Sequence, residues 1–352
     1  MEPRDPFATA TYDYELPPEL IAQSPAARRD EARLLVVEGH GELRHRRFSD
    51  LPRLLSRGDV IVANDTRVLR ARFRPKRKRG GAAQVLLLHP AQAPGSWLAM
   101  ARPGRRVRPG DRLTLEDGIG IEILDWAPGG DRIVRFFGIE AEEAMERFGE
   151  TPLPPYIRAA PPDAAERYQT VYAKRLGSVA APTAGLHFTQ ALIAALRADG
   201  VAWTTITLDV GAGTFRPVSE VDIRHHFMHA ERYAIGEDAA AAIARARIEG
   251  HRVVAVGTTT LRALEDARRS SADGLIHAGE RWTSLFLHPP EPVGAADALI
   301  TNFHLPRSTL LMLACAFAGT DNVLGAYREA VRERYRFYSF GDAMFLENTS
   351  AC

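Results

Sequence analysis

A turn of small residues stands directly before a histidine in the stretch SVAAPTAGLHFT, residues 178–189. The letters PTAG predict a turn that lets a small ligand approach the backbone, and LHFT predicts the opening of a helix. Because a helix dipole at that point lowers the pKa of an imidazole, we expect His187 to be neutral and able to act as a base. The alternative is that His187 caps the turn and only packs. Thr183 and Gly185 are candidate ligand contacts in the same turn.

Four further stretches have one order of residues: an apolar strand, then small and hydroxyl residues, and often a helix after them. They are VIVANDTRV, ITLDVGAGTFRPV, VVAVGTTTLRALE and ALITNFHLPRSTLLML. Ligands bind at the carboxyl ends of strands in open α/β sheets, so we expect these turns to meet at one cleft. Free N–H groups at the helix starts favour anionic groups there. The candidate contacts are Asn64, Asp65, Thr66, Arg67, Asp209, Gly211, Gly213, Thr214, Phe215, Thr258, Thr259, Arg262, Asn302, His304 and Thr309.

Familiar phosphate and nucleophile motifs are absent from the chain. GAG lacks the third glycine of the dinucleotide motif, and neither Gly-Lys-Ser/Thr nor Gly-x-Ser-x-Gly occurs. The stretch RHHFMHAE offers His226, His229 and Glu231 as metal ligands, but no cysteine or second carboxylate joins them at metal spacing. We therefore expect no metal. The alternatives are that these side chains hydrogen-bond a polar substrate, or that one of the histidines is buried with its hydrogen bonds made inside the protein.

Positive charge is concentrated in one block. Residues 67–112 contain thirteen Arg or Lys and one acid, whereas residues 113–150 contain ten acids and three Arg. Such a local excess is typical of surfaces that bind phosphate backbones, and it makes Lys76, Arg77, Lys78 and Arg79 candidate contacts to a nucleic acid. The alternative is a solvated charged loop.

The chain of 352 residues exceeds the size at which single cores stop growing, about 250–300 residues, so we expect two domains. Residues 70–150 show short apolar stretches separated by Gly and Pro turns, which predicts a small antiparallel β-barrel. Residues 1–69 and 151–352 alternate strands with helices, which predicts an α/β domain with a largely parallel sheet, into which the barrel is inserted.

Location and redox state follow from simple features. The longest apolar run, residues 309–317, is shorter than the ~18–20 residues that span a bilayer, and MEPRDPF is not a secretory signal. The two cysteines, Cys315 and Cys352, provide no disulfide framework and suit a reducing cytoplasm. We expect a cytoplasmic protein with no membrane contact, and no obligate protein partner is evident.

Several long motifs occur in one order between Tyr12 and Leu346. They include NDTRVLRARF, PLPPYIR, RYQTVYA, GSVAAPTAGLHFT, DVGAGTFRPV, HFMHAERY, VGTTTLRALE, LITNFHLPRSTLLMLACAFAG and YRFYSFGDAMFL. Together they resemble the S-adenosylmethionine:tRNA ribosyltransferase-isomerase family of the queuosine pathway. The resemblance implies transfer of the ribosyl part of S-adenosylmethionine to 7-aminomethyl-7-deazaguanine at the tRNA wobble position. Rearrangement to the epoxide releases adenine and methionine. The resemblance also implies that tRNA and S-adenosylmethionine are the partners. S-adenosylmethionine is consumed as a substrate, and no cofactor is needed.

The resemblance gives the candidate residues their expected roles. His187 with Asp65 would serve proton transfer from the 5′ carbon beside the sulfonium, with His229 and His304 as the next candidates for the base. Asp209 would hold ribose hydroxyls, and Arg262 the methionine carboxylate.

The chain departs from the family at Pro290-Glu291, where Gly-Tyr is usual. That departure keeps open a non-catalytic RNA-binding relative with the same fold. An unrelated α/β sugar-nucleotide enzyme is a third alternative.

Overall fold

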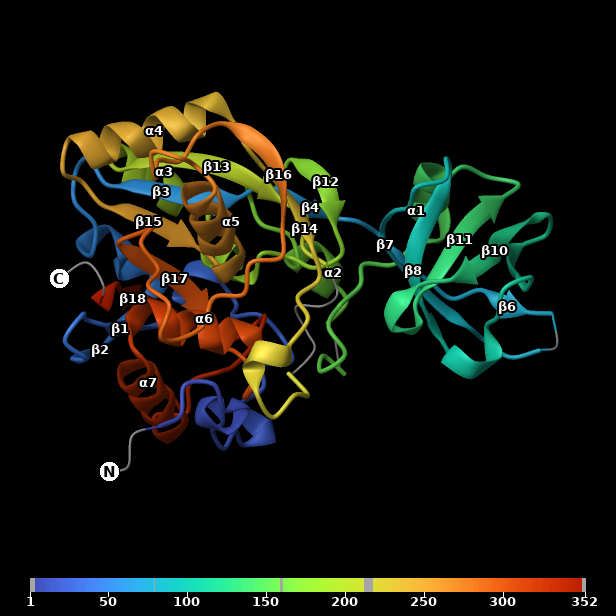
Figure 1. The fold of residues 1–352 in the computed structure, drawn as a ribbon, viewed down its shortest axis with the longest axis horizontal. Coiled ribbons are helices and arrows are strands. Elements are labelled where there is room, and N and C mark those ends of the chain that lie inside the picture. The colour runs from blue at the N-terminus through green and yellow to red at the C-terminus, as the bar shows by residue number, and fades with distance from the viewer. Residues whose placement is uncertain (1–3, 79, 159–160, 212–217, 350–352) are drawn as a thin grey trace. The chain divides into compact units, whose positions relative to one another are not determined.

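The computed structural model describes residues 4–78, 80–158, 161–211 and 218–349. The chain divides into two compact units. The large unit comprises Met1–Thr66, Pro155–Arg175 and Ala181–Cys352, and the small unit comprises Arg67–Pro154 and Leu176–Ala180. Each unit is built around its own sheet (Figure 1). Gly213, Thr214, Phe215 and Arg79, which the sequence singled out, lie outside the described residues.

The large unit contains a nine-stranded mixed sheet. Four adjacent strands in its middle, β13, β3, β15 and β17, run parallel, and so do β18 and β1. The other four contacts between neighbours are antiparallel, so the expectation of a largely parallel sheet was confirmed only for its central strands, and the whole sheet is mixed. Apolar patterning identifies a strand but not its direction, and the short β1–β2 hairpin loop forces antiparallel pairing. The strand order is β16 (Gly279–Thr283), β14 (Glu231–Ile235), β13 (Ala202–Leu208), β3 (Val60–Asn64), β15 (Val253–Val256), β17 (Ala298–Asn302), β18 (Ala343–Glu347), β1 (Arg33–Val37), β2 (Leu43–Arg47).

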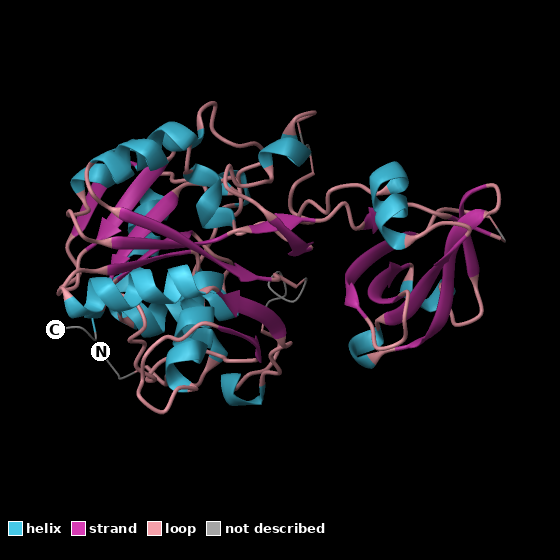
Figure 2. Cartoon of the chain, turned by 90° about the horizontal axis from the view of Figure 1, so that it is seen from above, coloured by secondary structure: helices cyan, strands magenta, loops and turns pink. Residues whose placement is uncertain are grey.

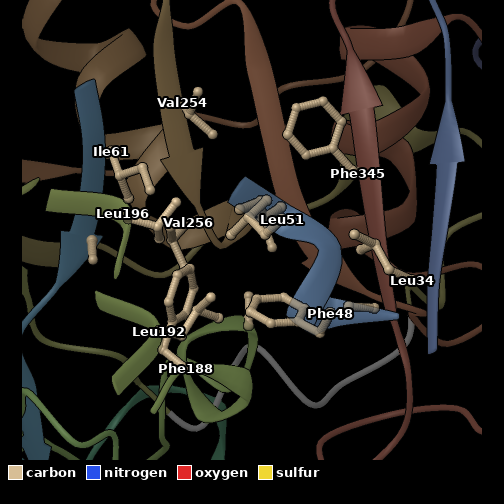
Figure 3. Close-up of a cluster of buried hydrophobic side chains, with 14 of the residues drawn as sticks. Leu34, Phe48, Leu51, Ile61, Phe188, Leu192, Leu196, Val254, Val256 and Phe345 are labelled. Carbon is tan, nitrogen blue, oxygen red and sulfur yellow. The ribbon is translucent and has the colours of Figure 1, made fainter. Parts of the chain in front are cut away.

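Helices lie on both faces of this sheet (Figure 2). They include α3 (Gln190–Ala198), α4 (Glu237–Ile248), α5 (Thr258–Arg269) and α6 (Thr309–Ala318), and α7 (Thr320–Arg332) follows α6. On one face, side chains of the central strands pack against α3 and the segment Phe48–Arg53 (Figure 3). Each large apolar side chain buried there contributes about 1.5–3 kcal/mol before entropy is counted. This core gives the strand ends a rigid base.

One local expectation was wrong. LHFT does not open a helix, because Thr183–His187 forms a short 3₁₀ helix and α3 begins only at Gln190. The Thr189 side chain caps α3 by accepting a hydrogen bond from the Leu192 N–H at 3.1 Å. The cap residue, rather than the first apolar residue, sets the start of the helix.

The small unit contains a seven-stranded antiparallel sheet. Its two outer strands, β5 and β6, are separated in the chain only by Arg74 and Pro75, so the sheet must curl until its edges approach. Helix α1 (Ala141–Phe148) follows the last strand. The strand order is β5 (Arg72–Phe73), β7 (Gln84–Pro90), β8 (Ser96–Arg102), β11 (Arg132–Phe137), β10 (Ile119–Trp126), β9 (Arg112–Glu116), β6 (Lys76–Arg77).

No single helix in the described ranges is long and apolar enough to cross a membrane; α6 and α7 pass that test only as a pair bent by 118°.

Candidate active site

Four of the predicted turns lie at one edge of the large-unit sheet. Strands β13, β3, β15 and β17 are parallel neighbours, so their carboxyl ends lie side by side. Asp209 follows β13, Asp65 follows β3, Thr258 begins α5 after β15, and His304 follows β17. The 183–187 turn joins them, because a Cβ on Gly257 would meet the Ala184 Cβ at 3.8 Å. The fold therefore gathers the five turns at the place where α/β sheets bind ligands.

His187 is a buried, neutral imidazole. Its Nε2 lies 3.2 Å from the Asn302 Nδ2, and the same amide nitrogen donates to the Tyr338 carbonyl at 3.1 Å. Nε2 is then the acceptor, and the ring carries its proton on Nδ1. Burial lowers the pKa of His187 from 6.5 to about 4. The cause is desolvation rather than the expected helix dipole, since His187 ends a 3₁₀ turn and stacks near Phe48 at 5.0 Å.

Asn64, the last residue of β3, and Asp65, which follows it, have different roles. Asp65 is buried, and its two carboxylate oxygens accept hydrogen bonds from Thr207 Oγ1 at 2.7 Å and Thr205 Oγ1 at 3.1 Å. Asn64 joins β3 to β13, because its amide donates to the Leu208 carbonyl at 2.9 Å and accepts from the Leu208 N–H at 3.0 Å. Asn64 is therefore a structural clamp that places Asp65.

The neighbours of Asn64 differ in their placement. Asn64 Oδ1 also accepts the backbone N–H of Thr66 at 3.1 Å, which makes buried Thr66 part of the clamp. Arg67 is exposed and belongs to the small unit.

Asp209 retains acceptor capacity at the end of β13. Its carboxylate is about one quarter exposed and has a long contact to Arg232, 3.4 Å from Nη1 to Oδ2. Burial raises the pKa of Asp209, against the lowering effect of Arg232. Arg232 binds Glu280 more closely, at 2.7 Å. A carboxylate held this loosely can still accept hydroxyl donors.

Arg262 and Glu231 form a buried ion pair at the same edge. Glu231 also accepts the backbone N–H of Gly211 through Oε1 at 2.7 Å, just before the undescribed residues 212–217. Burial lowers the pKa of Arg262 to about 10. Arg262 therefore already faces one carboxylate, with further N–H groups on its guanidinium.

The remaining candidates near the sheet edge are mainly buried. Thr258 and Thr259 begin α5. Thr309 begins α6, where the Ser308 Oγ accepts the Leu311 N–H at 3.2 Å. His304 Nε2 lies 2.7 Å from Thr301 Oγ1, and burial lowers its pKa to about 3.

The three residues weighed as metal ligands do not assemble. His226 pairs with Glu220 at 3.2 Å, His229 is exposed beside Phe227, and Glu231 binds Arg262. Within the described ranges, the group whose ligand atoms all lie within 4.8 Å of one another is Glu38, His40 and Glu42, at the β1–β2 hairpin. Exposed groups of this kind are common without an ion.

Sequence reasoning missed Tyr172 and Thr170 of the YQTVYA stretch. A Cβ on Gly185 would lie 2.0 Å from the Tyr172 hydroxyl and 2.8 Å from the Thr170 Cγ2. The close approach of the Tyr172 side chain is thus enough to require glycine at position 185. Burial raises the pKa of Tyr172, which stays a neutral phenol. The sequence signal that could have identified them is the spacing of two hydroxyl residues, Thr170 and Tyr172, two positions apart in YQTVYA.

Three buried polar atoms beside the 183–187 turn have no hydrogen-bond partner in the described part of the chain. They are Tyr172 Oη, Thr170 Oγ1 and Asn302 Oδ1. Buried polar atoms are usually satisfied, so such a group needs a water or a ligand to complete it.

The fold is that of an α/β enzyme with a candidate ligand site at the carboxyl ends of parallel strands and an accompanying antiparallel β unit. The chain belongs to the family described as queuosine biosynthesis protein, whose model matches residues 9–346.

Relatives and a solved structure agree with this assignment. The chain is 53% identical over 339 residues to the S-adenosylmethionine:tRNA ribosyltransferase-isomerase of Moorella thermoacetica, covering 95% of this chain and 98% of that protein. It is 51% identical over 345 residues to the protein of that name from Thermus thermophilus, with 95% and 98% covered. A crystal structure of the S-adenosylmethionine tRNA ribosyltransferase from Thermotoga maritima is 36% identical, with a TM-score of 0.54 and coverage of 95% and 99%.

Proposed function

We propose that the chain catalyses the reaction for which its relatives are named. It transfers the ribosyl part of S-adenosylmethionine to 7-aminomethyl-7-deazaguanine at the wobble position of tRNA. It then isomerises the sugar to give epoxyqueuosine, with release of adenine and methionine. The chain is accordingly a transferase of queuosine biosynthesis. Identity of about half over 95% of the chain carries this proposal.

The proposed chemistry needs a base for the 5′ carbon beside the sulfonium. His187 suits this role because its imidazole is neutral at physiological pH and its Nε2 is the acceptor nitrogen. The hydrogen bond from the Asn302 amide to Nε2 must break when substrate binds. Asp65 accepts hydrogen bonds from two threonine hydroxyls, which fix the position of its carboxylate. We assign Asp65 to offset positive charge near the base rather than to abstract the proton itself.

The proposed substrate contacts follow from the remaining groups. Asp209 holds ribose hydroxyls, supported by its partial exposure and long Arg232 contact. Arg262 shares its guanidinium between Glu231 and the methionine carboxylate, supported by its place at the start of α5. No cofactor is needed, because the sulfonium of S-adenosylmethionine supplies the activation and is consumed.

The small unit carries tRNA affinity in this proposal. The proposed contacts to the tRNA phosphates are Lys76, Arg77, Lys78 and Arg79, the last of which lies outside the described residues. The domain of residues 70–150 is the inserted barrel that carries them. We place the protein in the cytoplasm, where tRNA is modified.

The decisive experiment is adenine release. Purified protein is incubated with S-adenosylmethionine and precursor tRNA, and free adenine is measured. A non-catalytic RNA-binding relative would bind the tRNA and release none. The altered Pro290-Glu291 segment prompted that alternative, yet Glu291 has its own partner, Arg269 at 2.7 Å. The segment is therefore anchored to the end of α5.

A further inference from the structure

Two connections of the small-unit sheet are unusually basic. The β6–β7 connection spans residues 78–83, and the β8–β9 connection spans residues 103–111. With the flanking strand ends, residues 76–83 and 102–111 contain eight Lys or Arg and a single acid, Asp111. The four candidate contacts Lys76, Arg77, Lys78 and Arg79 are therefore only half of this group.

Strand register places the two connections side by side. Arg77 of β6 pairs with Leu113 of β9, and Gln84 of β7 pairs with Arg102 of β8. Both connections therefore run between the β6–β9 pair of strands and the β7–β8 pair of strands. Neighbouring strands lie about 4.8 Å apart, so the backbones of the two connections begin and end within one strand spacing of each other.

Ion pairing separates these cations from three other exposed arginines of the small unit. Arg74 binds Glu150 at 3.0 Å, Arg135 binds Glu122 at 3.1 Å, and Arg147 binds Glu116 at 2.9 Å. Within the described ranges, the cations of the two connections form no ion pair with any carboxylate. They are Lys76, Lys78, Arg102, Arg105, Arg106 and Arg108, all exposed.

A buried arginine fixes the β8–β9 connection from inside the unit. Arg132 is 1% exposed and stacks on Trp126, with Cζ 3.6 Å from the ring centroid. Its guanidinium donates to the carbonyls of Gly104 at 2.6 Å and Val107 at 2.9 Å. Because these carbonyls are held inward, the side chains of Arg105 and Arg106 project from an ordered turn into solvent.

We propose that the two connections form one phosphate-binding surface for the tRNA backbone. Arg102, Arg105, Arg106 and Arg108 contribute to it together with the Lys76–Lys78 strand end, and Arg132 is the positioning residue. The inference rests on the proposed function for the identity of the RNA. A cation without a carboxylate partner neutralises phosphate at no cost in lost ion pairs, whereas a paired one must first break its bridge.

The test compares two triple variants of equal charge change in the full-length protein. The first is Arg105→Gln/Arg106→Gln/Arg108→Gln, and the matched control is Arg74→Gln/Arg135→Gln/Arg147→Gln. Binding of precursor tRNA is measured over a range of salt concentrations. We expect the first variant to lose about 0.7–0.9 of salt slope per contact, hence roughly 2–3 in all, with Kd and KM raised at least tenfold. The control should lose less than about one unit of slope.

The outcomes separate this inference from the proposed function. An unchanged slope for the first variant, or an equal loss in the control, overturns the surface even when wild-type protein releases adenine. Absence of adenine release from wild-type protein overturns the proposed function, while the slopes still report on the surface.

Arg132→Lys tests the positioning role. This variant keeps the charge but cannot reach both carbonyls of the turn. A positioning role predicts a smaller salt slope for tRNA, although Arg132 itself is too buried to meet a phosphate. A lower melting temperature with an unchanged slope would mean that Arg132 only stabilises the unit.

Discussion

The Asn302 side-chain amide meets the His187 imidazole across 115 residues of chain, with 3.2 Å between Nδ2 and Nε2. Asn302 ends β17, and His187 ends the 3₁₀ turn that packs beside it. This contact fixes the tautomer of the ring, while burial fixes its charge. The same contact occupies the nitrogen that a base would use, so its opening is part of the proposed chemistry.

His187 should remain neutral in the folded protein down to about pH 4, whereas an unfolded histidine protonates near 6.5. The folded pKa is the lower one. Its contribution to stability is therefore fully present above pH 6.5 and is lost as the pH falls from 6.5 to about 4, by roughly 3 kcal/mol. NMR titration of the ring carbons measures this directly. A midpoint near 6.5 in folded protein would contradict the burial argument.

His187→Ala should abolish adenine release while tRNA binding survives, because the variant removes the proposed base and leaves the small unit intact. Removing a general base typically costs about 10²–10⁴ in rate. Asn302→Ala serves as the comparison, since it frees Nε2 and changes the positioning of the ring. Normal turnover by His187→Ala would make His187 a packing residue, and His304 and His229 would then be examined next.

Gly185→Ala should destabilise the protein by about 1–3 kcal/mol, because the new Cβ collides with the Tyr172 hydroxyl. Tyr172→Phe removes an unpartnered buried hydroxyl and should lie within about 1 kcal/mol of wild type. The double variant should recover part of the loss, as measured by denaturant unfolding, because Thr170 Cγ2 still lies 2.8 Å from the new Cβ. Equal instability of the single and double variants would show that the hydroxyl is not the obstacle.

Arg262→Met should cost about 3–5 kcal/mol, because it leaves the Glu231 carboxylate buried without its cation. Arg262→Met/Glu231→Gln removes that charge and should regain much of the stability, while the glutamine oxygen still accepts the Gly211 N–H. If Arg262 also holds the methionine carboxylate, the stable double variant retains a raised KM for S-adenosylmethionine. A wild-type KM in that variant would remove Arg262 from substrate binding.

Adenine release should be unaffected by a strong chelator, because His226 and Glu231 are engaged with Glu220 and Arg262. The assay is repeated after dialysis against the chelator and again with added Zn²⁺. Loss that Zn²⁺ reverses would make His226, His229 and Glu231 the first residues to test, despite their separate partners.

Local features of the sequence located the turns and part of the secondary structure. Alternating strand and helix patterns indicated the α/β unit, Gly and Pro turns indicated the β character of the small unit, and the basic block was visible as a count of charges. The five turns could be found because each has its own small and hydroxyl residues. Their meeting followed from one general rule, that parallel strands end at the same edge.

Only the tertiary structure decided what each side chain touches. Asn302 beside His187, Glu231 beside Arg262 and Tyr172 against Gly185 are contacts between distant segments, which no local pattern encodes. They depend on strand register and burial, which change hydrogen-bond partners and pKa values without changing the sequence pattern. Register likewise decided that the β8–β9 connection lies beside the β6–β7 connection, because charge patterning along a chain gives the number of cations but not which strands pair.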